Sequence, residues 1–224
     1  MKVSLSFNSS SSEDVAIMVD VLRASTTINV AMDNFKKIIP VKGIEEAQIL
    51  AKNYNNSVLA GERRGAAIKG FDTGNSPIEI SNFSGDVLVI TTSNGTRIME
   101  GIKAKILIGS FVNAKAVAKK ALSLAESHID LVMAGVEGRF AIEDFLGAGN
   151  IISNLKNQDL DETAIAAYMA SIDASMVDKV IKNSRSARRL TEIGLSEDVD
   201  FCLKRNIYDH VPVYENGSIT GKLE

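Results

Sequence analysis

Two glycine-containing motifs carry side chains suited to anion and metal chemistry. Gly61-Glu62-Arg63-Arg64-Gly65 lies a few residues before Gly70-Phe71-Asp72-Thr73-Gly74-Asn75-Ser76-Pro77. Glycine lets the backbone turn at positive φ and approach a ligand closely. Arginine side chains and exposed N–H groups bind phosphate or sulfonate, and carboxylates bind a divalent cation. The pair of motifs therefore predicts an anion and metal site. The alternative is a tight surface turn, but a turn alone does not need Arg, Glu and Asp together.

A second group of polar residues stands where the expected strands end. In open α/β sheets, ligands bind outside the carboxyl ends of the strands. Polar segments follow strand ends at 20–27, 91–96, 109–113 and 134–139, and Glu62 follows a further short strand. Asp20 ends an apolar strand, so its carboxylate would be partly buried and would need a partner such as a metal ion. Mg²⁺ prefers a few carboxylates together with water and substrate oxygens, and the candidate ligands are Asp20, Glu62, Asp72, Glu143 and Asp144.

Several of these polar residues also have simpler explanations. Glu143 and Asp144 fit the acidic first turn of an ordinary helix. Ser25, Ser93 and Asn94 stand where helix N-caps are expected. The stretch 91–96 still resembles a phosphate cradle, because it offers five side-chain oxygens where one cap needs one. Arg23 would hold a phosphoryl or sulfonate group bidentately, and a surface ion pair is its alternative.

The elements that must position these residues follow from the hydrophobic pattern. β-type runs alternate with helical patterns up to residue 155, which predicts a layered α/β/α fold with a mostly parallel or mixed central sheet. Strands are expected at 1–7, 15–20, 37–41, 57–60, 87–91, 105–108 and 129–134. Helices are expected at 24–32, 44–53, 94–101, 113–125 and 143–155.

The pattern changes after Leu155. A helical C-terminal block over 156–206 is expected to hold helices at 163–171, 176–181 and 184–193. The tail, 207–224, contains a terminal β-hairpin around an Asn-Gly turn. Because no linker, repeat or low-complexity tract interrupts the chain, we expect a single domain over 1–224, with 1–155 as its α/β core.

Composition excludes several classes of function. Hydrophobic residues make up 45% and charged residues 24% of the 224, as in soluble globular proteins. A net charge of −3, 5% aromatic residues and no Trp argue against nucleic-acid binding. No signal-type run or membrane-spanning segment is found, so we expect a cytoplasmic protein without a membrane partner. Cys202, the single cysteine, is expected to pack in a helix rather than act as a nucleophile.

Common catalytic signatures are missing from the sequence. It has no Walker phosphate loop and no Rossmann glycine fingerprint after a strand. His128 and His210 belong to no polar cluster, so we expect neither to be catalytic. A haloacid dehalogenase phosphatase has a second aspartate two residues after the first, whereas Leu22 stands at that position after Asp20.

Taken in order, the motifs at 20–27, 61–65, 70–77 and 91–96 resemble those of the 2-phosphosulfolactate phosphatases. Segment 109–113 and the helix with Glu143 and Asp144 are also similar, and the block from Gly70 to Pro77 is the specific one. The resemblance implies a layered α/β fold distinct from the common phosphatases. It also implies a Mg²⁺-dependent enzyme that hydrolyses (2R)-2-phospho-3-sulfolactate to 3-sulfolactate and phosphate, a step toward coenzyme M.

From these observations together we expect catalytic roles for Asp20, Arg23 and Asp72. The metal ligands are expected among Asp20, Glu62, Asp72, Glu143 and Asp144. The expected substrate-binding residues are Arg63, Arg64, Gly74, Asn75, Ser76, Thr92, Ser93, Asn94, Gly95, Thr96, Ser110, Asn113 and Arg139. The attacking group is either a metal-activated water or a carboxylate, with Asp20 the expected nucleophile.

Three other interpretations are compatible with the same residues. A non-catalytic sensor of a small phosphorylated or sulfonated anion would use the glycine loop and the arginines but not the surplus of acids. A purely structural module would respond to neither Mg²⁺ nor phosphate. A phosphatase of another phosphorylated 2-hydroxy acid would differ only in its substrate. The expected partner is a small phosphoester, and a homodimer is the common default.

Overall fold

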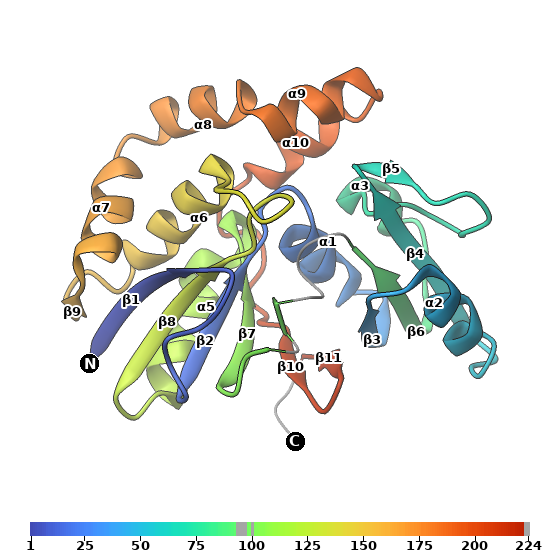
Figure 1. Cartoon of the computed structure of the whole chain (residues 1–224), viewed down its shortest axis with the longest axis horizontal. Helices are drawn as coiled ribbons and strands as arrows, with labels where there is room; N and C mark the ends of the chain where they lie inside the picture. Colours follow the sequence, from blue (N-terminus) through green and yellow to red (C-terminus); the bar gives the residue numbers. More distant parts are fainter. Residues whose placement is uncertain (93–97, 100, 222–224) are drawn as a thin grey trace.

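The computed structural model describes residues 1–92, 98–99 and 101–221. Its strands form one 11-stranded sheet in the order β5-β4-β6-β3-β11-β10-β7-β2-β8-β1-β9 (Figure 1). The strands are β1 Lys2–Phe7, β2 Val15–Val19, β3 Phe35–Val41, β4 Ser57–Arg63, β5 Ala66–Ala67, β6 Gly85–Thr91, β7 Lys105–Gly109, β8 His128–Met133, β9 Asp159–Leu160, β10 Val213–Glu215 and β11 Ser218–Thr220. Every strand predicted from the sequence is present, whereas the two-residue strands β5 and β9 were not predicted.

The sheet consists of two parallel groups joined by the C-terminal hairpin. One group is β4-β6-β3, and the other is β7-β2-β8-β1-β9. Strand β10 pairs antiparallel with β7, and β11 pairs antiparallel with β3. The turn residues Asn216 and Gly217 have φ angles of 49° and 76°, which a two-residue hairpin with the native twist requires. The hairpin is confirmed, and its place at the centre of the sheet makes the sheet mixed.

Helices cover both faces of this sheet, which confirms the layered α/β fold. Those predicted from the sequence in the core are α1 Ala24–Ala31, α2 Ile44–Ala51, α5 Ala114–Leu124 and α6 Ile142–Ile152. Along β2, Val15, Ile17 and Val19 pack in the cluster that holds α5 and α6. Met18 points to the opposite face and packs in the cluster that holds Ile28 of α1. The alternation follows from the two-residue period of a strand.

Two short helices, α3 Pro77–Ile80 and the 3-10 helix η1 Phe111–Asn113, were not predicted as helices. Proline at the first position and the side chain of Ser76 at the cap explain why α3 begins there. The helix predicted at 94–101 falls mainly on residues outside the described part of the chain.

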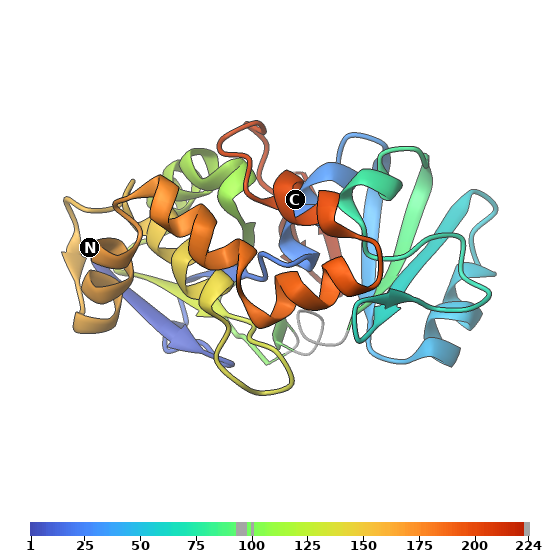
Figure 2. The ribbon, with the colours of Figure 1, turned by 90° about the horizontal axis from the view of Figure 1, so that it is seen from above.

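The C-terminal helices extend over the edge of the sheet where β2 and β4 end. They are α7 Glu162–Ala170, α8 Ala174–Lys182, α9 Arg185–Glu192 and α10 Ser196–Cys202. Both views show them running from the β1 and β8 side toward α3 and β5 (Figures 1 and 2), and α10 contacts α3. Their buried residues Ala164, Val177, Leu190 and Val199 belong to the same core cluster as β2. In the described residues no helix has the length and apolarity needed to cross a membrane.

Candidate active site

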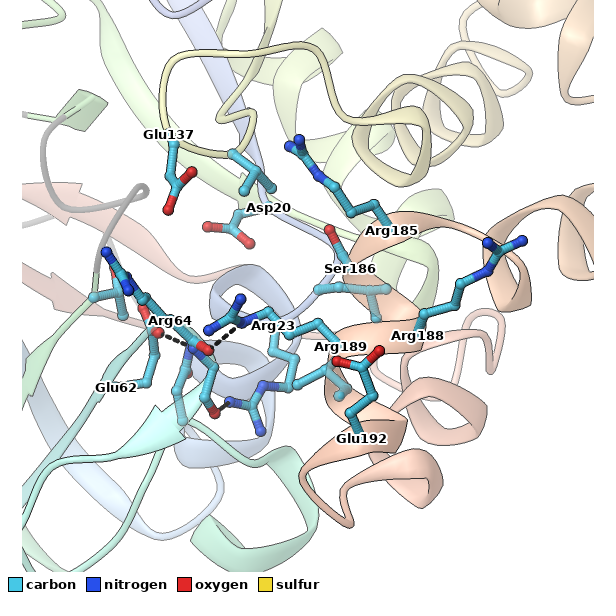
Figure 3. Close-up of a pocket in the computed structure, with 16 residues that line it drawn as sticks. Asp20, Arg23, Glu62, Arg64, Glu137, Arg185, Ser186, Arg188, Arg189 and Glu192 are labelled. Carbon is cyan, nitrogen blue, oxygen red and sulfur yellow. Dashed lines mark hydrogen bonds between the residues drawn. The ribbon is translucent and has the colours of Figure 1, made fainter.

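A cavity of about 440 Å³ lies between the ends of the strands and helix α9 (Figure 3). Five of the predicted segments meet in it: the end of β2, the end of β4 with the turn to β5, the loop before α3, the end of β6, and the loop after β8. The lining residues are Asp20, Leu22, Arg23, Glu62, Arg64, Gly65, Asn75, Thr92, Val136, Glu137, Arg185, Ser186, Arg188, Arg189, Leu190 and Glu192. Six of the residues predicted for the site therefore lie in one cavity.

Asp20 follows β2 and is buried against the N-terminus of α1. Its backbone N–H donates to Ser25 Oγ at 2.9 Å, and its Oδ1 accepts a hydrogen bond from Ala24 N–H at 3.2 Å. Burial, followed by the nearby carboxylates of Glu62 and Glu143, raises the pKa of Asp20 to about 7. Ionised carboxylates are costly to bury together unless a cation balances them. The position of Asp20 therefore favours a bound cation.

Arg23 is held by two short contacts that orient its guanidinium group. Nη1 forms an ion pair with Asp198 Oδ2 at 2.6 Å, and Nη2 donates to the Gly65 carbonyl oxygen at 2.6 Å. Asp198 also accepts a hydrogen bond from Ser76 Oγ at 2.6 Å. Asp198 thus joins α10 to the motifs at 20–27 and 70–77, a role that no local pattern around Asp198 indicated. Its carboxylate comes from a segment 175 residues away from Arg23.

The turn between β4 and β5 shapes one side of the cavity. Glu62 Oε2 accepts a hydrogen bond from Gly65 N–H at 2.6 Å. Gly65 has a φ of +88°, a conformation that glycine adopts without steric cost, and Arg64 has a φ of 56°. This conformation lets the Gly65 carbonyl reach Arg23, as Figure 3 shows. The prediction that this glycine motif brings backbone close to a site agrees with its place in the cavity wall.

Asp144 and Glu143 lie in the first turn of α6, outside the residues that line the cavity, and both are buried. Asp144 accepts hydrogen bonds from the N–H groups of Val21 at 2.8 Å and Gly135 at 2.9 Å. It therefore ties together the loops that follow β2 and β8. Burial, then the charges of Asp20 and Glu143, raises the pKa of Asp144. Glu143 Oε1 is buried and has no hydrogen-bond partner among the described residues.

The remaining predicted residues lie outside the cavity lining, and several make other contacts. Asp72 is exposed, and its Oδ2 accepts the Leu59 N–H at 2.8 Å. Ser110 Oγ shares a hydrogen bond with Thr26 Oγ1 at 2.8 Å, and Asn113 Oδ1 accepts the Ser110 N–H at 3.0 Å. The other residues placed outside the lining are Arg63, Gly74, Ser76 and Arg139. The structure therefore does not bring this group into contact with the cavity.

Part of the predicted phosphate cradle lies outside the described residues. Thr92 lines the cavity at the end of β6. Ser93, Asn94, Gly95 and Thr96 follow it directly, and the structure does not describe them. Asn75, in the second glycine motif, lines the cavity as well, and its buried Oδ1 has no partner among the described residues.

Helix α9 is the part of the site that sequence reasoning missed. Arg185, Arg188 and Arg189 all line the cavity. Their spacing of three and four residues puts them on one helix face, and this was the available signal. The predicted helix at 184–193 was correct, but nothing local indicated which part of the sheet it would cover. His128 and His210 do not line the cavity.

A model of the 2-phosphosulpholactate phosphatase family matches residues 3–217. A relative from Methanothermobacter thermautotrophicus, named 2-phosphosulfolactate phosphatase, is 50% identical over 220 residues, which are 98% of this chain and 95% of the relative. A Clostridium tetani protein named as a probable 2-phosphosulfolactate phosphatase is 40% identical over 91% of this chain and 90% of its own length. These matches confirm the resemblance found in the motifs: the chain belongs to the 2-phosphosulfolactate phosphatase family, a family of phosphoric monoester hydrolases.

Proposed function

We propose that this enzyme hydrolyses (2R)-2-phospho-3-sulfolactate to 3-sulfolactate and phosphate in a Mg²⁺-dependent reaction. The observation that carries the proposal is the position of Asp20 in a cavity that arginines line. The negative charges of Glu62 and Glu143 are near enough to raise the pKa of Asp20. A cluster of acids suits a cation, and guanidinium groups suit an anion. A cation and a phosphoester that bind side by side need both kinds of residue. The name of the Methanothermobacter relative supports the same substrate.

The size of the cavity agrees with a small ester. Pockets for small ligands have volumes of roughly 300–1,000 Å³, and this cavity has about 440 Å³. The substrate has three carbons and three anionic groups, so it needs several charged partners within a short distance. Arg23, Arg64, Arg185, Arg188 and Arg189 all line the cavity. This set is richer in cations than a neutral or singly charged ligand would need.

Two carboxylates fit a magnesium ion in this site. In the described residues no group of three or more His, Cys, Asp or Glu side chains is arranged for a metal. Mg²⁺ does not need such a group, because it usually binds one or two carboxylates together with water and substrate phosphate. Of the five predicted ligands, Asp144 is engaged by two backbone N–H groups, Glu62 accepts the Gly65 N–H, and Asp72 lies elsewhere. Glu143 has a buried oxygen without a partner among the described residues, and its charge acts on Asp20.

We therefore assign Asp20 and Glu143 as the residues that would hold Mg²⁺. When bound, the ion would supply charge neutralisation at the phosphoryl oxygens. The chain itself orients the ester. Arg23 is fixed by Asp198 and the Gly65 carbonyl, so it presents its guanidinium to the cavity without losing side-chain entropy at binding. It would stabilise the negative charge that develops on the transferred group.

Asp20 stands at the reaction centre in either route of hydrolysis. In the covalent route, Asp20 Oδ2 attacks phosphorus, the bond from phosphorus to the C2 oxygen breaks, and that oxygen takes a proton. Water then attacks the acyl phosphate and releases phosphate. In the direct route, water attacks phosphorus and Asp20 remains unmodified. Acid-quench trapping of a phosphorylated Asp20 distinguishes the two routes.

The decisive experiment is phosphate release from a panel of esters. We expect turnover of phosphosulfolactate that stops with EDTA and returns with Mg²⁺, and slower turnover of phospholactate and phosphoglycolate. Asp20→Asn is expected to lose at least about a hundredfold in kcat, the size of effect seen for removal of one essential electrostatic group. Full activity in EDTA would contradict the metal assignment. A preference for phosphoglycolate would contradict the substrate.

Three finer expectations stay predictions. We propose that the reaction serves coenzyme M biosynthesis, as the family resemblance implies. Loss of coenzyme M in a deletion strain, restored by added 3-sulfolactate, would test this placement. A cytoplasmic location and a homodimer are predicted from the sequence alone, and cell fractionation and light scattering would test them.

A further inference from the structure

The charged side chains that line the cavity come from two sides. Asp20, Arg23, Glu62 and Arg64 come from the ends of β2 and β4 and the residues that follow them, on the sheet side, and these four charges balance. Arg185, Arg188, Arg189 and Glu192 come from α9, on the opposite side (Figure 3), which therefore carries a net positive charge. A site whose two sides differ in net charge orients a ligand whose charged ends differ.

Two of the five cavity arginines are engaged in contacts within the protein. Arg23 pairs with Asp198, as described above. Arg189 Nε donates to the Arg64 carbonyl oxygen at 2.6 Å. This second bond holds α9 against the turn between β4 and β5. A Cβ at Gly65 would lie 3.4 Å from Ile193 Cδ1 and 3.6 Å from Leu190 Cδ2, so the turn and the end of α9 are in close packing. Helix α9 is thus fixed in place over the cavity.

Arg185, like Arg64 and Arg188, forms no ion pair with any other residue that the structure describes. It is the first residue of α9, directly after the N-cap Ser184, whose Oγ accepts the Ala187 N–H at 3.1 Å. Figure 3 shows its side chain extending toward the part of the cavity that holds Asp20 and Glu137, whereas Arg188 extends away from it. Its backbone is anchored by the cap, and its guanidinium faces the cavity.

The connectivity of the proposed substrate indicates which anionic group would reach Arg185. Phosphate and carboxylate are both attached through C2, so they stay close to each other. The sulfonate is on C3 and is the group that can extend farthest from the phosphoryl group. With the phosphoryl group beside Asp20 and Arg23, the sulfonate would point across the cavity toward α9. Guanidinium binds such oxyanions through two parallel N–H donors.

We infer that Arg185 forms the sulfonate subsite of this enzyme and thereby sets its preference for sulfonated over unsulfonated phosphoesters. The inference rests on the proposed function and adds a role for the C-terminal helical block. That block would carry specificity, while the sheet carries the groups that react. Arg185 is then a specificity residue whose removal weakens the recognition of one end of the substrate. It does not alter the groups around phosphorus.

The test compares two substrates that differ only in the sulfonate. We expect Arg185→Ala and Arg185→Gln to lower kcat/KM for phosphosulfolactate by roughly 10- to 100-fold, the range for one charge-assisted hydrogen-bonded contact. For phospholactate the loss is expected to stay below about threefold. Lys179→Ala is the matched control, because it removes an exposed positive charge from α8 that does not line the cavity. We expect it to change neither value.

Inhibition gives an independent readout. 3-Sulfolactate should inhibit Arg185→Ala at least about tenfold more weakly than the unmodified enzyme, with inhibition by inorganic phosphate unchanged. Equal losses on both substrates, or no loss on either, would overturn the sulfonate subsite even if the proposed function holds. If the unmodified enzyme does not hydrolyse phosphosulfolactate, the proposed function fails. A thermal shift by 3-sulfolactate that Arg185→Ala abolishes would then still support the subsite, and an unchanged shift would refute it.

Discussion

Removing the carboxylate of Asp198 is the most informative perturbation, because one buried group holds Arg23 and the second glycine motif together. The side chains of Arg23 and Asp198 are each only 2% exposed, and their ion pair is 2.6 Å long. Asp198→Ala leaves the guanidinium buried without its counter-charge and removes the acceptor of Ser76 Oγ. Breaking a buried pair from one side costs about 3–5 kcal/mol. We expect a loss of this size in the free energy of unfolding.

Activity should fall along with stability, for a separate reason. Arg23 would keep its bond to the Gly65 carbonyl but lose the contact that fixes its other nitrogen. Because Arg23 acts on the developing charge, we expect kcat to fall by tenfold or more while KM changes little. Urea unfolding measures the first effect, and phosphate release well below the unfolding temperature measures the second. The double variant Arg23→Met, Asp198→Ala should be more stable than Asp198→Ala alone, since it no longer buries an unpaired charge.

A loss below about 1 kcal/mol in Asp198→Ala would refute this reasoning, because so small a value is typical of an exposed pair. It would mean that water or another carboxylate replaces the missing partner. Unchanged kcat in a destabilised variant would show that Asp198 supports the fold but does not position Arg23.

Two further predictions concern buried positions that do not line the cavity. Burial raises the pKa of Cys202 to about 12, so the thiol stays neutral from pH 7 to 9 and is not nucleophilic. We expect Cys202 to react with a disulfide reagent only when the protein unfolds. Rapid labelling of Cys202 in the native enzyme would contradict this. A Cβ on Gly149 of α6 would collide with the Ala167 carbonyl oxygen of α7, so we expect Gly149→Ala to lower the free energy of unfolding by about 1–3 kcal/mol in urea titrations. Gly138→Ala is the control, because a Cβ there meets no described atom within 4 Å and the only cost is that of the positive φ.

The elements of the core could be predicted because their signals are local. The apolar run at 15–20 has the length and composition of a buried strand, and β2 has five fully buried residues there. The Asn-Gly pair predicted the hairpin, since both turn residues need positive φ. Strands β5 and β9 have two residues each and leave no periodic signal. Ser76 and Pro77 have the N-cap and first-position residues typical of a helix start, and α3 begins there. The helix was not predicted, because the same residues were interpreted as part of a ligand-binding loop.

The candidate site was predicted in part, and the difference lies in what each polar side chain contacts. Asp20, Glu62 and Asn75 line the cavity, as predicted from the chemistry of their motifs. Ser110 and Asn113 have similar chemistry but are engaged in buried hydrogen bonds near the start of η1. A side chain of the right type can serve a ligand or its own backbone, and the residues next to it do not decide which.

The order of residues along the chain determined the layered fold, the acids and arginines at the strand ends, and membership of the family, because these depend on periodicity and on motifs a few residues long. Only the tertiary structure decided that α9 covers the cavity and that Asp198 is the partner of Arg23. Packing of the C-terminal helices onto the sheet brings together groups 175 positions apart, and no local pattern records a contact over such a separation.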